Sequence, residues 1–250
     1  EKLFLTKFLI IFQILVVKNT NSYLTGQNLQ GSLPPELIRL PYIQQINFSL
    51  NFLSGKIPKE WGSLKLVNMY VFSLIFPFPT IIFSSLITLF GNRLSGPIPV
   101  ELANITTLRC LILESNNFSG NLPPQLGYLP NIEIFRLGDN QFSGTIPSFI
   151  KNWTSLQILD IQGSGLGGPF PTGFSFPQSL TILEVSDLNG PDSTFPLVNI
   201  IGLRRLILRS CNINDTIPYY IGNLTNLKVF LLLLPYKLWW RQDNHWKYDI

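Results

Sequence analysis

Apolar and polar residues recur in one fixed order along most of the chain. A clear copy of this order reads L-x-x-L-x-L-x-x-N-x-F-S-G-x-L-P and runs from Leu108 to Pro123. In most copies the position of the asparagine returns after 24 residues. Its successive occupants are Gln27, Asn51, Asn92, Asn116, Asn140, Ser164, Leu188 and Cys211. A repeat of this length is the signature of similar structural units stacked on one another.

The spacing of the apolar residues predicts one short strand in each copy. Successive side chains of a strand point to opposite faces, so Leu111 and Leu113 turn inward while Ile112 turns outward. A single unit cannot bury its apolar residues alone, but stacked units share one continuous core. We therefore predict a leucine-rich-repeat solenoid, with parallel β-strands on its concave face and short 3-10 or irregular segments on its convex face.

The other fixed residues of the repeat each have a physical role. The asparagine stands where the chain turns inward, and its amide can satisfy backbone groups of neighbouring coils. A glycine usually follows four residues later, as at Gly120 and Gly144, where a tight bend favours a residue without Cβ. A proline follows at seven, as at Pro123 and Pro147, and fixes the backbone angle φ.

The S-G-x-I-P ending of several copies, as in Ser95–Pro99, resembles the plant-specific class of leucine-rich repeat. This class occurs in receptor-like kinases and in polygalacturonase-inhibiting proteins. Residues 26–31 (GQNLQG) and 101–105 (ELANI) most resemble receptor-like serine/threonine kinases that carry a malectin-like domain after the repeats. The resemblance extends from Leu24 to Lys228 with one interruption. It implies an extracellular repeat region that binds a ligand or partner in cell-surface signalling.

The repeat pattern divides the chain into five parts. Leucine-rich repeats occupy residues 24–69 and 89–230. Residues 1–23 form an apolar N-terminal segment, which is either signal-like or non-coding read-through. Residues 70–88 form an apolar insertion, and residues 231–250 form a tail outside the repeat.

The three stretches outside the pattern leave and rejoin it at nearly the same phase. We interpret them as intron read-through in a gene built from one-repeat exons. A tolerated loop insertion and a membrane span are the alternatives for residues 70–88, and Pro77 and Pro79 argue against the span. The resembled family closes its first coil with a paired-cysteine cap, whereas Cys110 and Cys211 lie about four coils apart. We therefore expect an uncapped, truncated array.

Composition and motifs exclude several kinds of chemistry. The formal net charge is +4, and the basic residues are too scattered to form the basic stripe that nucleic-acid binding requires. The single histidine, His245, lies in the tail, which argues against a histidine-dependent active site or metal site. Residues 163–168 satisfy G-x-G-x-x-G, but Pro169 follows instead of a phosphate-binding helix. We predict no enzyme activity, cofactor or metal in this chain, so the kinase activity implied by the resemblance lies outside it.

The outward positions of the predicted strands form the candidate binding surface. The candidate residues are Ile112, Glu114, Arg136, Asp160, Glu184 and Arg209. Neighbouring strands lie about 4.8 Å apart, so Arg136 and Asp160 are expected to pair. These charges form either a solvated ladder of ion pairs, which stabilises little, or a mixed-charge site for a peptide or partner. Arg204, Arg205 and Arg209 form a basic patch suited to an acidic ligand or to pectin.

Six Asn-x-Ser/Thr sequons suggest a secreted glycoprotein. They begin at Asn47, Asn104, Asn117, Asn152, Asn214 and Asn223. A repeat rich in Leu, Asn and Ser also produces sequons by chance. Asn47 projects outward from a predicted strand, so a glycan there would compete with binding at the concave face.

Together these patterns favour the ligand-sensing region of a plant receptor-like kinase. We expect a peptide or protein ligand, with a co-receptor ectodomain among the candidate partners, and no nucleic acid. The expected location is the extracellular side of the plasma membrane, within a longer membrane protein whose span lies outside this chain. Two alternatives are a secreted inhibitor of a cell-wall hydrolase and a gene fragment that makes no functional protein.

Overall fold

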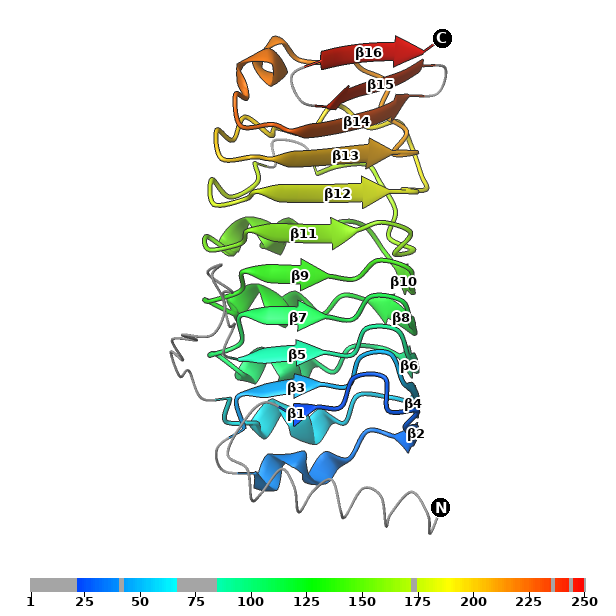
Figure 1. Cartoon of the computed structure of the whole chain (residues 1–250), viewed down its shortest axis with the longest axis vertical. Helices are drawn as coiled ribbons and strands as arrows, with labels where there is room; N and C mark the ends of the chain where they lie inside the picture. The colour runs from blue at the N-terminus through cyan, green and yellow to red at the C-terminus, as the bar shows by residue number, and fades with distance from the viewer. Residues whose placement is uncertain are drawn as a thin grey trace.

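Strands from successive repeats lie side by side in a computed structural model of the chain (Figure 1). The structure describes residues 22–40, 43–66, 85–171, 175–234, 237–242 and 245–249. Within these ranges eleven strands form the main sheet, in chain order. They are β1 (Ser22–Tyr23), β3 (Gln45–Asn47), β5 (Leu86–Thr88), β7 (Cys110–Ile112), β9 (Ile134–Arg136), β11 (Ile158–Ile161), β12 (Ile182–Ser186), β13 (Arg205–Arg209), β14 (Val229–Leu234), β15 (Lys237–Gln242) and β16 (His245–Asp249).

The main sheet is parallel from β1 to β14, which confirms the predicted solenoid. Short 3-10 helices lie on the opposite, convex side of the coils (Figure 1). They are η1 (Pro35–Arg39), η2 (Lys59–Ser63), η3 (Val100–Asn104), η4 (Pro124–Tyr128), η5 (Ser148–Asn152) and η6 (Tyr219–Asn223). The proline of the repeat directly precedes each of these helices, because its fixed φ suits the extended residue before a helix.

A second parallel sheet, which the repeat pattern did not predict, runs along one flank of the solenoid. Its strands are β2 (Gln30–Ser32), β4 (Phe52–Gly55), β6 (Arg93–Gly96), β8 (Asn117–Asn121) and β10 (Gln141–Ser143). Each strand begins directly after the asparagine position or within three residues of it. Past β10 the flanks of adjacent coils meet only through isolated bridges, such as Thr145 with Gly167 and Gly167 with Asn189.

Leucine, isoleucine and aromatic side chains from all the coils form one core between the main sheet and the 3-10 helices. Leu111 and Leu113 are fully buried, as the strand pattern predicted. Trp61 and Trp153 are also fully buried, and each indole satisfies its polar N–H across a coil boundary. Trp153 Nε1 donates to the Leu126 carbonyl at 3.0 Å, and Trp61 Nε1 donates to the Pro34 carbonyl at 2.9 Å.

The repeat asparagines tie neighbouring coils together. Asn116 Nδ2 donates to the carbonyl oxygens of Leu89 at 2.9 Å and Leu113 at 3.1 Å, and its Oδ1 accepts from the Leu94 N–H at 3.1 Å. Asn140 makes the equivalent bonds one coil later. The next occupant, Ser164, is too short to span the coils, and its hydroxyl accepts only from the Leu166 N–H. The asparagine ladder and the second sheet therefore end at the same coil.

Strands extend slightly into the stretches that the pattern left outside the repeat. Ser22 and Tyr23 form β1, and Leu86–Thr88 form β5 between β3 and β7. Most of the N-terminal segment and of the 70–88 insertion lies outside the described residues. In the 231–250 tail, β15 and β16 continue the main sheet in antiparallel order. Nowhere in the described ranges is there a helix long and apolar enough to cross a bilayer.

Candidate functional site

Four of the predicted binding residues form one row on the face of the main sheet turned away from the core, which we call the concave face. Strand register aligns Ile112 with Arg136, Arg136 with Asp160, and Asp160 with Glu184. Arg209 and Glu114 each follow two residues further along their own coils, and Arg209 pairs in register with Ser186. The repeat spacing therefore placed these side chains in rows as expected.

Ion pairs connect the charged side chains of this row. Arg136 Nη2 lies 2.9 Å from Asp160 Oδ2, and Arg136 Nε lies 3.4 Å from Glu114 Oε2. One coil further, Arg205 pairs with Glu184, which also accepts a hydrogen bond from Gln162 Nε2 at 3.0 Å. The expected pairing of Arg136 with Asp160 is present, within a longer network that holds these side chains in place.

The carboxyl groups of the network are largely shielded from water. Asp160 is 2% exposed and Glu184 is 7% exposed. Burial raises the pKa of Glu184, the nearby Asp160 carboxylate raises it further, and Arg205 opposes this. Burial also raises the pKa of Glu114 more than Arg136 lowers it. The centre of the concave face thus contains acids that bind protons more readily than exposed carboxyls do.

Apolar side chains stand beside the charged row. The residues at the start of successive strands are aligned in register: Leu86, Cys110, Ile134, Ile158 and Ile182. Burial raises the pKa of the Cys110 thiol to about 12, and that of Cys211 also to about 12. Both thiols are therefore protonated at neutral pH, which makes them packing residues rather than nucleophiles.

The residue just before each strand forms a further row, which sequence reasoning overlooked apart from Arg204. We call it the pre-strand row: Arg109, Glu133, Gln157, Thr181, Arg204 and Lys228. Arg109 and Glu133 form an ion pair within it. Their spacing of 24 residues was the available signal, because it equals the repeat length.

The predicted basic patch is divided by the structure. Arg205 is paired with Glu184, and Arg209 Nη2 lies 3.4 Å from Asp187 Oδ2. Only Arg204 of the three is without an ion pair among the described residues. The three arginines therefore do not act as one patch of free positive charge.

The sequons differ in accessibility. Asn104, Asn152 and Asn223 are exposed at the last residues of η3, η5 and η6, which places them at equivalent points of the convex side. Asn117 and Asn214 are exposed as well. Asn47 is half-buried, and its Oδ1 accepts from Thr25 Oγ1 and from the Ser49 N–H, both at 3.1 Å.

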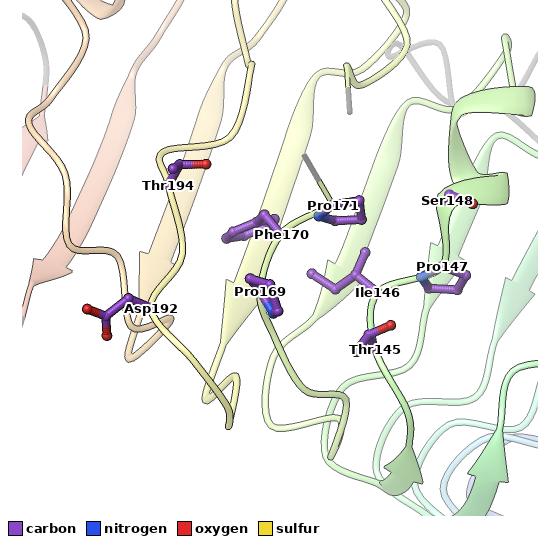
Figure 2. Close-up of a pocket in the computed structure, with 9 residues that line it drawn as sticks. All are labelled: Thr145, Ile146, Pro147, Ser148, Pro169, Phe170, Pro171, Asp192 and Thr194. Atoms are coloured by element: carbon purple, nitrogen blue, oxygen red, sulfur yellow. The ribbon is translucent and has the colours of Figure 1, made fainter. Parts of the chain in front are cut away.

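A hollow of about 420 Å³ opens on the flank, where the second sheet ends. Its lining residues are Thr145, Ile146, Pro147, Ser148, Pro169, Phe170, Pro171, Asp192 and Thr194 (Figure 2). Ile146 and Phe170 are buried, whereas Asp192 lies at the far edge with its carboxylate turned away from Ile146.

The structure removes the nucleotide-binding interpretation of residues 163–168. These residues form a turn of the coil in which Gly167 bridges to Thr145 and Asn189, and no helix follows. Within the described ranges no group of three or more His, Cys, Asp or Glu side chains is placed to bind a metal ion.

Comparison with known proteins agrees with this geometry. A family model described as Leucine Rich Repeat matches residues 107–129, 131–153 and 202–224. The chain is a leucine-rich-repeat protein. A probable leucine-rich-repeat receptor-like serine/threonine kinase of Arabidopsis thaliana is 42% identical over 95 residues, which make up 38% of this chain and 8% of the kinase. A second such kinase of Arabidopsis thaliana is 46% identical over 84 residues, or 34% of this chain and 7% of that protein.

Solved structures show the same relationship for the leucine-rich-repeat fold. The chain is similar to a TDR receptor, with a TM-score of 0.67 and 26% identity over 83% of this chain and 33% of the receptor. It is also similar to the leucine-rich-repeat ectodomain of the Arabidopsis thaliana receptor kinase GASSHO1/SCHENGEN3, with a TM-score of 0.59 and 27% identity over 80% of this chain and 22% of that one. The chain thus corresponds to the repeat regions of plant receptors and not to a kinase domain.

Proposed function

We propose that this chain is the extracellular ligand-binding repeat region of a plant receptor-like kinase and binds a peptide or protein through its concave face. A co-receptor ectodomain is among the partners that such a face would accept. The place of action would be the outer side of the plasma membrane. The resemblance of residues 26–31 and 101–105 supports a receptor with a malectin-like domain after the repeats.

One observation carries the proposal: charged and apolar side chains occupy adjacent rows of the concave face. Arg136, Asp160 and Glu184 lie in register on consecutive strands, next to Ile134, Ile158 and Ile182. Such a surface offers hydrogen-bonding groups and apolar contact to one extended ligand. Because ion pairs already hold the charged groups, a ligand would meet a surface that needs little reordering.

The similar receptors support this use of the face. GASSHO1/SCHENGEN3 was crystallised in complex with CASPARIAN STRIP INTEGRITY FACTOR 2. PEPR1 was crystallised with AtPEP1, and this chain matches it with a TM-score of 0.59 and 25% identity over 80% of its own length. Both proteins combine the fold described above with a bound partner.

The test is selection from a random peptide library displayed on phage, using the full chain as bait. Two double variants are matched in the side chains that they lose. Ile112→Ser with Arg209→Gln alters the concave face, whereas Tyr128→Ser with Lys151→Gln alters the convex side.

We expect the wild-type chain to enrich peptides that the convex variant still binds. Their affinity for the concave variant should fall about tenfold or more, the usual effect of losing a central contact. Equal loss on both variants, or enrichment of no peptide, would contradict the proposal. Both variants should melt at the wild-type temperature, because surface substitutions usually change stability by less than about 0.5 kcal/mol.

A further inference from the structure

The pre-strand row is continuous across the coils that carry the binding face. The Glu133 N–H donates to the Arg109 carbonyl at 2.7 Å, and the Lys228 N–H donates to the Arg204 carbonyl at 2.8 Å. The same contact joins Gln157, Thr181 and Arg204 to the residue before each of them. Side chains of adjacent coils are therefore neighbours all along this row.

The two ends of the row differ in charge. At one end Arg109 pairs with Glu133, so the cation has an anion from the next coil. At the other end Arg204 is followed by Lys228, and both side chains are exposed. Neither of them forms an ion pair with any residue in the described ranges. Two neighbouring cations thus occupy the geometry that elsewhere in the row brings a guanidinium and a carboxylate into contact.

The surrounding acids do not neutralise this pair. Glu184 is engaged by Arg205 and by Gln162, and Asp187 lies against Arg209. Like charges held side by side repel each other, and one anion between them removes that repulsion and binds to both. The pair lacks an anion that the protein supplies at the equivalent place four coils earlier.

We propose that Arg204 and Lys228 bind a carboxylate of the peptide ligand. This inference rests on the proposed function and names the chemistry of one end of the ligand. The carboxylate can belong to an Asp or Glu side chain or to the C-terminus of the peptide. A guanidinium and an ammonium together can donate to both of its oxygens.

An apolar contact lies within reach of the same ligand. Ile207 and Leu231 are aligned in register on β13 and β14, three residues beyond Arg204 and Lys228. Three residues of a strand span roughly 10 Å, which a peptide covers in about three residues. Leu233 is 37% exposed on the same face. The preferred ligand therefore carries an apolar side chain about three residues from its carboxylate.

The row favours a peptide over a pectin chain. A polyuronate carries a carboxylate on every sugar and needs a run of free cations. The residues next to the pair are Thr181 and Gln157, followed by Glu133, which is an acid. Only one carboxylate therefore finds two cations here.

Lys228→Glu provides the sharpest test, because it would reproduce the Arg109–Glu133 pair and fill the site from within. Peptides selected on the wild-type chain should contain Asp, Glu or a free C-terminus, and replacing that carboxylate by its amide should weaken binding about tenfold. Lys228→Glu should cause a similar or larger loss. Lys151→Glu makes the same change of charge on the convex side and should leave the affinity unchanged.

The outcomes separate this inference from the proposed function. Peptides that depend on the concave face but bind Lys228→Glu normally would overturn the carboxylate site and leave the proposed function standing. Enrichment of no peptide would count against both. Oligogalacturonide binding that is lost in Lys228→Glu while peptide binding persists would assign the pair to pectin instead. Amidated peptides distinguish a C-terminal carboxylate from a side-chain one, and an unchanged melting temperature of Lys228→Glu excludes a merely structural role.

Discussion

Arg136 Nη2 lies 2.9 Å from Asp160 Oδ2 across the boundary between two consecutive coils. The two partners differ sharply in exposure, with the Arg136 side chain 36% exposed and that of Asp160 3% exposed. The arginine therefore covers a carboxylate that water hardly reaches. This relationship joins the stability of the coil stack to the surface that we propose for ligand binding.

Removing this cation should destabilise the fold. Arg136→Gln leaves the Asp160 charge without its partner, and we expect a loss of roughly 2 kcal/mol, below the roughly 3–5 kcal/mol of fully buried pairs. Arg209→Gln is the matched control, because Asp187 remains in contact with water and the loss should stay within about 0.5 kcal/mol. Urea unfolding of the two variants measures the difference. Equal losses would show that burial of Asp160 is not decisive.

Stability should depend on pH through Glu184. Its pKa is raised in the folded chain, so the folded state binds the proton more tightly than the unfolded state does. Its contribution is therefore favourable below the ordinary carboxyl pKa and is lost as pH rises through the raised value. The melting temperature should rise between pH 7 and pH 5 in wild type and change less in Glu184→Gln. Glu36→Gln on the exposed face of η1 controls for the loss of one charge, and an identical profile for both variants would refute the assignment.

Gly165 should not tolerate a side chain. Its φ is +87°, and an added Cβ would lie 2.5 Å from the Phe142 carbonyl oxygen. Gly165→Ala should therefore cost about 2 kcal/mol or more, from backbone strain and from displacement of the neighbouring coil. At Gly222 a Cβ would meet nothing within 4 Å, so Gly222→Ala should be neutral or slightly stabilising. Thermal unfolding compares the two, and a tolerated Gly165→Ala would mean that the coils can move apart at low cost.

Glycans should decorate the convex side when the chain is secreted from plant cells. Mass spectrometry of tryptic peptides should find Asn104, Asn152 and Asn223 modified, because each is exposed at the end of a 3-10 helix. Asn47 should remain unmodified, since its carboxamide is half-buried and accepts two hydrogen bonds. A glycan on Asn47 would show that this part of the concave face is open before the chain finishes folding.

The sequence alone determined the solenoid, the inward residues of each strand and the rows on the concave face. These follow from a repeat of 24 residues and from alternation along a strand, both of which are local properties. The bonding of Asn116 to two coils also followed, because a side-chain amide at an inward turn has few other partners.

The tertiary structure alone decided which charges are free. Arg204, Arg205 and Arg209 look alike in the sequence, yet Glu184 and Asp187 neutralise two of them and leave Arg204 beside Lys228. The end of the second sheet at β10 was equally hidden. Both depend on how neighbouring coils stack and on which way each side chain points across the gap, and the sequence of a single coil holds neither.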